Sequence, residues 1–279
     1  IVGCGPAGLT LAAQLAAIGG LNVRIFEKRD GPLKVGQADG IACRSMEMFE
    51  AFGFVDRVAR ESYWVNVTSF WRPSPETIGI CRADRIQDVE DDISHQPHTI
   101  LSQARIHDFY LDLMSKSASR LKPDYNRALV AVERDNEGAF PVKLTFDCSD
   151  RPGSQEIVRA KYVVGCDGAR SQVRKSLGYS LKGEAARQLW GVMDVLAVTD
   201  FPDIRLKCAI QSASAGSMLI IPREGGALIR VYIELDALHV DERASDRKVT
   251  PEQLIKQARA VLAPFTFDVK EVAWWSAYE

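Results

Sequence analysis

Three glycines near the start of the chain have the spacing of a turn that binds dinucleotides. Gly3, Gly5 and Gly8 follow an apolar pair and precede apolar residues at helical spacing. The first glycine of such a turn permits a tight bend, the second lets a pyrophosphate reach the backbone, and the third lets helix and strand pack closely. The positive end of the helix dipole then faces the phosphates. We predict that this turn binds a dinucleotide through Gly3, Gly5, Pro6, Ala7 and Gly8.

A carboxylate stands where an adenosine ribose would lie. Glu27 ends a β-rich run over residues 22–27, nineteen residues after Gly8. There it can accept hydrogen bonds from ribose hydroxyls; the alternative is a surface carboxylate at a strand end. Glycines, strand, helix and acid in register favour the ribose contact. Glu27 would repel a 2′-phosphate, which leaves NAD or FAD for this pocket. Lys28 and Arg29 either contact the adenosine end or are solvated, and both possibilities stay open.

Asp167 is a second acidic candidate. It follows the apolar run Tyr162–Cys166 and precedes Gly168. Open α/β sheets bind their ligands at this edge of their strands. The competing interpretation is an Asp-Gly turn with a left-handed backbone conformation.

The elements that must position these residues alternate between two periodicities. Helical spacing predicts helices from Gly8 to residue 18 and over residues 103–121, 171–177 and 251–262. Strand patterns cover residues 63–70, 77–81, 125–133, 141–147, 157–166, 189–198, 207–211, 217–221, 227–235 and 266–273. We predict an α/β fold in which a Rossmann-like βαβ domain is interleaved with a mostly β domain. The nucleotide-binding domain takes residues 1–60 and 100–185, and the β-rich domain takes 61–99 and 186–279.

Composition excludes several classes of protein. The 279 residues carry 35 Lys and Arg against 37 Asp and Glu, a net charge of −2, and 46% are hydrophobic. This is an ordinary globular composition with no general attraction for nucleic acid. No apolar run reaches the ~20 residues of a membrane span. The six cysteines form no CxxC pair and the four histidines have no metal spacing, so we predict no metal site and a reduced, cytoplasmic protein.

Six ordered segments point to a particular family: Gly36–Ser45, Leu101–Arg105, Gly165–Ser171, Trp190–Asp194, Ile221–Gly226 and Trp274–Tyr278. In these segments the chain resembles the fungal phenol 2-monooxygenases, which belong to the class A flavoprotein hydroxylases typified by para-hydroxybenzoate hydroxylase. The resemblance runs from the first residue to the last.

The resemblance implies that FAD lies along the nucleotide-binding domain, with its ring at the junction with the β domain. The glycine turn and Glu27 would hold the ADP half, and Gln103 would contact the flavin side. The loop that contains Gly36, Gln37, Ala38 and Gly40 would run beside the ring. Asp167 would serve both FAD and NADPH. NADPH would be the reductant, and the protein would have no separate Rossmann domain to bind it.

The implied reaction uses O2 and a small phenolic substrate. Reduced flavin would form a C4a-hydroperoxide, which attacks the ring ortho to the hydroxyl and yields a catechol. The substrate must resemble a phenolate, because electron release from oxygen makes the ring carbon nucleophilic, and a base must remove the proton. Asp39 is our candidate base, and Tyr278 would bind the phenol oxygen or the flavin. Their alternatives are a capping carboxylate in an Asp-Gly turn and a core aromatic residue.

The chain also departs from the family pattern. Its first strand has two residues, and the Gly-Asp segment that binds the ribitol of FAD is not found before Glu279. We therefore expect a chain truncated at both ends. A hydroxylase of aromatic polyketides, a hydroxybenzoate-type hydroxylase and an inactive flavoprotein fragment remain alternatives. A homodimer of the full-length protein also remains open.

Overall fold

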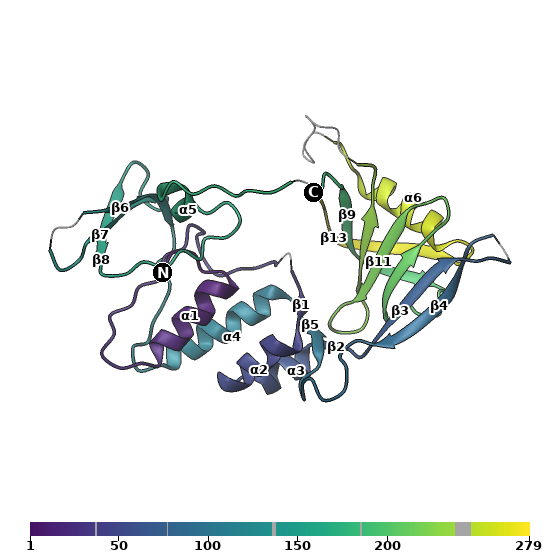
Figure 1. Ribbon diagram of the computed structural model, residues 1–279, viewed down its shortest axis with the longest axis horizontal. Coiled ribbons are helices and arrows are strands. Elements are labelled where there is room, and N and C mark those ends of the chain that lie inside the picture. The colour runs from purple at the N-terminus through teal and green to yellow at the C-terminus, as the bar shows by residue number, and fades with distance from the viewer. Residues whose placement is uncertain (37, 77, 136–137, 185, 238–246) are drawn as a thin grey trace. The chain divides into compact units, whose positions relative to one another are not determined.

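The computed structural model describes residues 1–36, 38–76, 78–135, 138–184, 186–237 and 247–279 (Figure 1). The chain forms two compact units, each built from two segments. The first unit consists of Ile1–Ala38 and Ser102–Gly183, and the second of Asp39–Leu101 and Glu184–Glu279. Residues 39–60, predicted for the nucleotide-binding domain, pack in the second unit. The fold is mixed α/β, as predicted.

Four short parallel segments form the centre of the first unit. Val2 pairs in parallel with both Phe26 and Gly165, and Phe26 pairs with Asp124. The predicted strand over 157–166 is therefore two pieces, an antiparallel strand and a separate segment around Gly165. Helix α1 (Pro6–Ala16) follows the first segment. The predicted βαβ unit is present, although its strands are limited to single bridges.

Helices and a second sheet cover these segments. Helix α1 packs along α4 (Gln103–Lys116), where Thr10 Oγ1 donates a 2.8 Å hydrogen bond to the Tyr110 hydroxyl (Figure 1). Phe26 stacks on Phe146 with ring centroids 4.4 Å apart. The antiparallel sheet contains β6 (Arg127–Arg134), β7 (Val142–Cys148) and β8 (Gln155–Ala160), followed by helix α5 (Gln172–Ser176).

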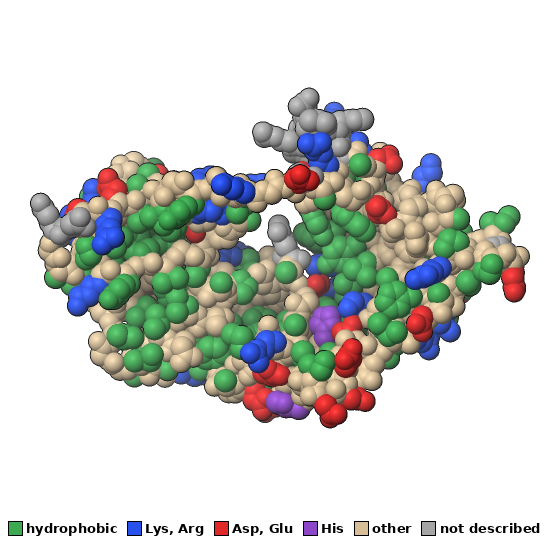
Figure 2. All heavy atoms as spheres, in the orientation of Figure 1, with side chains coloured by type: hydrophobic (Ala, Val, Ile, Leu, Met, Phe, Trp, Pro, Cys, Tyr) green, Lys and Arg blue, Asp and Glu red, His purple; other side chains and the backbone are tan. Residues whose placement is uncertain are grey.

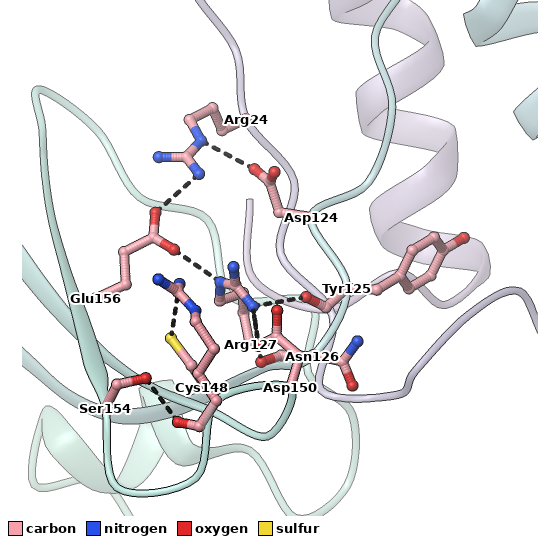
Figure 3. Close-up of polar contacts among 10 residues, drawn as sticks. Arg24, Asp124, Tyr125, Asn126, Arg127, Cys148, Asp150, Ser154 and Glu156 are labelled. Carbon is pink, nitrogen blue, oxygen red and sulfur yellow. Dashed lines mark hydrogen bonds and ion pairs between the residues drawn. The ribbon is translucent and has the colours of Figure 1, made fainter.

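Ion pairs join this sheet to the parallel segments (Figure 3). Arg24 contacts Asp124 at 2.9 Å and Glu156 on β8 at 2.9 Å. Arg127 contacts the same Glu156 at 2.7 Å. The Arg24 pairs are partly exposed and pairs of that kind contribute little individually, but here one carboxylate links two arginines from different segments.

A seven-stranded sheet dominates the second unit. Its order is β13-β9-β12-β11-β10-β3-β4, and only β10 and β3 run parallel among its pairings. The strands are β3 (Val67–Pro73), β4 (Ile80–Gln87), β9 (Trp190–Thr199), β10 (Lys207–Gln211), β11 (Ser217–Pro222), β12 (Ile229–Glu234) and β13 (Phe267–Tyr278).

Helix α6 (Pro251–Leu262) covers one face of this sheet and spans the residues predicted for it. Thr250 and Gln253 form a capping box at its start. Met193 and Val231 point into the core that α6 closes. Because side chains alternate along a strand, their neighbours in sequence lie on the opposite face.

Smaller elements support one end of the second unit. Strands β1 (Gly40–Ile41), β5 (His98–Ile100) and β2 (Tyr63–Val65) form a sheet in the order β1-β5-β2. Helices α2 (Cys43–Ala51) and α3 (Val55–Glu61) lie between β1 and β2 in the chain. The predicted strand over 63–70 is thus two strands in different sheets.

Charged side chains of both signs are spread among apolar ones on the face shown in Figure 2. None of the helices in the described part of the chain has the length and apolar character needed to cross a membrane.

Candidate functional site

The glycine turn has the backbone geometry expected of a phosphate-binding turn. Gly3 has φ +100°, and a Cβ there would overlap the Cys166 carbonyl. A Cβ at Gly8 would overlap the Gly3 carbonyl, so both positions exclude larger residues. A Cβ at Gly5 would meet nothing within 4 Å. Gly5 is the N-cap of α1 and no side chain caps the helix, so an anion can approach its first amides.

Pro6 and Ala7 form the exposed first turn of α1. Pro6 at this position leaves no amide unsatisfied, because proline has none. The first turn contains no acidic residue that would oppose a phosphate.

Glu27 is buried beside this turn, with 7% of its surface exposed. Its Oε2 accepts a hydrogen bond from the Cys4 amide at 2.8 Å, and its Oε1 accepts from the Arg29 amide at 3.1 Å. Burial alone would raise the pKa of Glu27, but these bonds and the Arg29 guanidinium lower it. The carboxylate is therefore held ionised, as a ribose acceptor must be.

The two basic neighbours of Glu27 differ from each other. Lys28 is exposed. Arg29 folds back, and its Nη2 lies 3.2 Å from Glu27 Oε2 and 3.0 Å from the Cys4 carbonyl oxygen. Arg29 is thus part of the framework around the turn rather than a simply solvated side chain.

The residues implied for the flavin side lie in both units. Gly36 contacts the start of α4 so closely that a Cβ there would overlap Gln103. Ala38 is exposed, and Gly40 pairs with Ile100 across β1 and β5. Gln37 lies outside the described residues.

Asp167 accepts hydrogen bonds at the start of helix α5, whose N-cap residue is Ser171. Its Oδ1 accepts from Ser171 Oγ at 2.6 Å, and its Oδ2 accepts from the Gln172 amide at 2.6 Å. Gly168 follows with φ +80°. Burial opposes ionisation, but these bonds hold the pKa of Asp167 below its usual value. The geometry is that of the alternative Asp-Gly turn, and a cofactor contact stays a prediction.

Asp39 is the centre of a buried charge cluster in the second unit. Only 6% of its surface is exposed. Asp39 Oδ2 lies 2.8 Å from Arg223 Nη1 and 3.0 Å from Arg230 Nη1. Arg230 also contacts Asp194 through Nε and Nη2, both at 2.7 Å. Glu224 pairs with Arg223 at 2.9 Å. Three carboxylates thus share two guanidinium groups.

The protonation of this cluster follows from burial and charge. Burial raises the pKa of Asp39, and the two arginines only partly oppose that effect. The pKa of Arg230 is raised by its bond to Asp194 and by both carboxylates, against the effect of burial. The guanidinium groups therefore stay charged, and Asp39 is a stronger proton acceptor than an ordinary aspartate.

The cluster lies on the sheet face opposite α6. Arg230 on β12 and Trp274 on β13 both stand in register with Asp194 on β9. The Arg230 guanidinium lies 5.1 Å from the centroid of the Trp274 ring. Tyr232, two residues further along β12, hydrogen-bonds Arg230, and burial raises the pKa of Tyr232.

Tyr278 lies on the same face of β13 as Trp274, four residues along the strand. It is 44% exposed, and the charges of Arg230 and Asp39 act electrostatically on its hydroxyl group. Burial raises the pKa of Tyr278. Its surroundings differ from those of a core aromatic residue.

A second polar network holds the segment that carries Asp39, directly before β1. The Asp39 carbonyl oxygen accepts from the Leu101 amide at 2.9 Å, just beyond β5. Within β5, His98 Nδ1 lies 2.6 Å from Asp88 Oδ2, and Lys207 Nζ contacts Asp88 Oδ1 at 2.8 Å. This network connects β5 to the large sheet.

Five residues around Asp39 carried no predicted role. Asp194, Arg223 and Glu224 lie in segments that carry the family resemblance, but their spacing alone indicates no chemistry. Arg230 and Tyr232 are polar positions of an alternating strand, Ile229–Glu234. The sequence does not show that the arginine at such a position is buried, and this burial is what marks it as part of a site.

A cavity in the described part of the chain lies apart from the predicted site residues. A cavity of about 640 Å³ in the second unit is lined by residues such as Trp64, Ile86 and His95, and its lining includes none of the predicted site residues. Within the part of the chain that the structure describes, no group of three His, Cys, Asp or Glu residues could hold a metal ion.

Comparisons with known proteins identify related chains. The family described as FAD binding domain matches residues 1–279. The chain is 56% identical to a 3-hydroxybenzoate 4-monooxygenase from Comamonas testosteroni, covering 100% of this chain and 44% of that protein. It is 34% identical to a phenol 2-monooxygenase from Aspergillus fumigatus, covering 100% and 45%. The chain thus spans less than half the length of these relatives.

A solved structure shows the same fold. The p-nitrophenol 4-monooxygenase PnpA from Pseudomonas putida DLL-E4 superimposes with a TM-score of 0.78 at 17% identity, over 99% of this chain and 66% of that one. The predicted resemblance to flavoprotein hydroxylases is confirmed at the level of the family. The comparisons do not favour the phenol 2-monooxygenases within this family, because the 3-hydroxybenzoate 4-monooxygenase has the higher sequence identity to the chain.

Proposed function

Because the chain belongs to the FAD-binding domain family over its whole length, we propose that it forms part of an FAD-dependent monooxygenase of hydroxybenzoate type. The reaction adds a hydroxyl group to a phenolic ring next to the existing one. The observation that carries this proposal is the buried Asp39 carboxylate between Arg223 and Arg230. The position of hydroxylation follows the name of the Comamonas relative, since carbon 4 of 3-hydroxybenzoate adjoins carbon 3.

The residues of the first unit fit FAD. The open side of Gly5 admits a pyrophosphate, and the overlaps at Gly3 and Gly8 explain why glycines form the turn. Glu27 supplies an ionised acceptor for the ribose. When bound and reduced, FAD would supply the activation of O2 for transfer of an oxygen atom to the ring.

Asp39 accepts the phenol proton in this proposal. A phenolate releases electrons to the ortho carbon, which becomes the nucleophile. The raised pKa of Asp39 makes it a better acceptor, while Arg223 and Arg230 keep it ionised until a substrate arrives. Tyr232 and Tyr278 present hydroxyl groups on the same face and would orient the substrate oxygen.

NADPH is the proposed reductant. Glu27 would repel the 2′-phosphate of NADPH from the ribose position beside the glycine turn. NADPH would therefore act without occupying that pocket. Asp167 is the proposed residue that serves both coenzymes.

Substrate class is tested by comparing aromatic compounds. With the FAD-loaded enzyme, we expect NADPH oxidation coupled to formation of a dihydroxybenzoate from 3-hydroxybenzoate. Phenol should react at least about 10-fold more slowly. A tenfold preference corresponds to a free-energy difference of ~1.4 kcal/mol. Coupled turnover of phenol with none of 3-hydroxybenzoate would instead support a phenol 2-monooxygenase, for which the A. fumigatus relative is the argument. Product formation measured by chromatography decides.

The Glu27→Ala variant tests the ribose contact. We expect the FAD dissociation constant to rise about 10- to 100-fold, because two hydrogen bonds to a charged acceptor are lost. Titration of apoprotein with FAD, followed by flavin fluorescence, measures this. Asp30→Ala is the matched control, since Asp30 is an exposed acid three residues away. Unchanged affinity in a folded Glu27→Ala protein would rule out the contact.

A further inference from the structure

Cys4, inside the glycine turn, is held by side chains at both its amide and its carbonyl group. The Cys4 amide donates to Glu27 Oε2 at 2.8 Å. The Cys4 carbonyl oxygen accepts from His107 Nε2 at 2.7 Å and from Arg29 Nη2 at 3.0 Å. We propose that His107 is a positioning residue for dinucleotide phosphates, acting through the Cys4–Gly5 peptide. The inference rests on the proposed binding of FAD.

The Cys4–Gly5 peptide unit connects His107 to the open side of the turn. In a trans peptide the C=O and N–H bonds point in opposite directions, and the Cys4–Gly5 peptide is trans. His107 and Arg29 draw the Cys4 carbonyl towards α4 and the interior. The Gly5 N–H is therefore directed away from the interior.

The Gly5 amide is available to a ligand. It has no acceptor among the described residues of the chain. A Cβ at Gly5 would meet nothing within 4 Å, so the same region of the turn is open. An amide that points to open space at a helix N-terminus is a donor for an anionic oxygen.

His107 is itself buried at a cost. It is 2% exposed, and its Nδ1 atom has no hydrogen-bond partner among the described residues. Because a carbonyl oxygen only accepts, Nε2 must carry the hydrogen and Nδ1 must carry a lone pair. A buried nitrogen without a partner is unfavourable. The contact to Cys4 is the interaction that offsets this cost.

Acid should disturb this arrangement. Burial lowers the pKa of His107, so the imidazole is neutral at neutral pH. Protonation at lower pH would place a hydrogen on Nδ1, which has no acceptor. The Arg29, Asp108 and Glu27 side chains act on the imidazole electrostatically, and the Cys4 Sγ atom lies 3.7 Å from Nε2. FAD affinity should therefore fall as the pH drops below the ordinary range of histidine. The Glu27 pKa is also held below its usual value, so Glu27 stays ionised over the ordinary range of histidine.

The test uses two substitutions that separate the ring nitrogens. A glutamine amide can occupy the place of Nε2, whereas an asparagine amide reaches only the place of Nδ1. We expect His107→Gln to bind FAD within about twofold of the parent. His107→Asn and His107→Leu should bind about 5- to 10-fold more weakly, the effect of losing one hydrogen bond. FAD titration of the apoprotein by flavin fluorescence is the measurement.

Controls keep the outcome decisive. His95→Ala removes a histidine whose exposed side chain pairs with Glu50, and it should leave FAD affinity unchanged. The acid loss of affinity should be weaker in His107→Gln than in the parent. Parent-like FAD affinity in both His107→Asn and His107→Leu would overturn this inference and leave the proposed function unaffected. If His107→Leu does not fold, the Asn and Gln variants decide in the same way. A parent protein that binds no FAD would overturn the proposed function and this inference together.

Discussion

Replacing Asp39 by Asn should slow hydroxylation by about 100-fold or more while FAD stays bound. General base catalysis contributes about 10²–10⁴-fold, and asparagine has the same shape but accepts no proton. Asp39 is buried and lies between Arg223 and Arg230, so water cannot readily take over its role. NADPH oxidation should continue and become uncoupled, with hydrogen peroxide formed in place of the hydroxylated product.

The measurement compares product formed with NADPH consumed, together with the FAD dissociation constant. Asp84→Asn serves as the matched control, because Asp84 is exposed and its Oδ1 accepts from the Arg85 amide, a bond that asparagine can keep. Hydroxylation by Asp39→Asn at the parent rate would show that Asp39 is not the base. Loss of FAD together with activity would indicate instead a structural role for Asp39.

The second large effect concerns stability. We expect Arg230→Met to lower the free energy of unfolding by about 3–5 kcal/mol, the cost of removing one partner from a buried ion pair. Arg230 is 2% exposed and contacts both Asp194 and Asp39. In the variant only Arg223 would remain beside the two buried carboxylates.

Urea unfolding at several pH values measures this loss and its cause. Buried carboxylates that lose one of two cationic partners have higher pKa values in the folded protein, so the penalty is full above those values and declines as the pH falls through them. The difference between variant and parent should therefore shrink on acidification. Arg44→Met, which removes an 86% exposed side chain paired with Glu47, should change stability by less than about 1 kcal/mol. A pH-independent loss in Arg230→Met would point to lost packing rather than to unpaired charge.

The local signals in the sequence predict local structure well. The start of α6 follows from Pro251 at its first position and the capping residue Thr250, and both act within one turn of helix. The turn at Gly3 and Gly8 is predictable because only glycine permits such close approach of backbone segments. Ser171 caps α5 through the Arg174 amide, as its position suggests.

Predictions fail where a single pattern covers two elements. The apolar run to residue 166 predicts one strand, but β8 ends at Ala160 and a separate parallel segment follows near Gly165. The run over 63–70 likewise divides between two sheets. Periodicity records which faces are buried, and it carries no information on which strand is the partner. The assignment of residues 39–60 depends on the same missing information.

The sequence by itself indicated most of the elements, the dinucleotide turn and the candidate acids Glu27 and Asp167, because each depends on residues close along the chain, whereas Asp39 was singled out by the family resemblance. Helices α2 and α3 were not predicted. Only the tertiary structure decided which charges meet. Asp39 contacts Arg223, 184 positions away, and Arg223 and Arg230 both contact Asp194 on β9. These contacts depend on strand order and register, since a shift of one residue would turn Arg230 and Tyr232 towards α6. Sheet pairing, rather than any local preference, therefore assembles the charge cluster around Asp39.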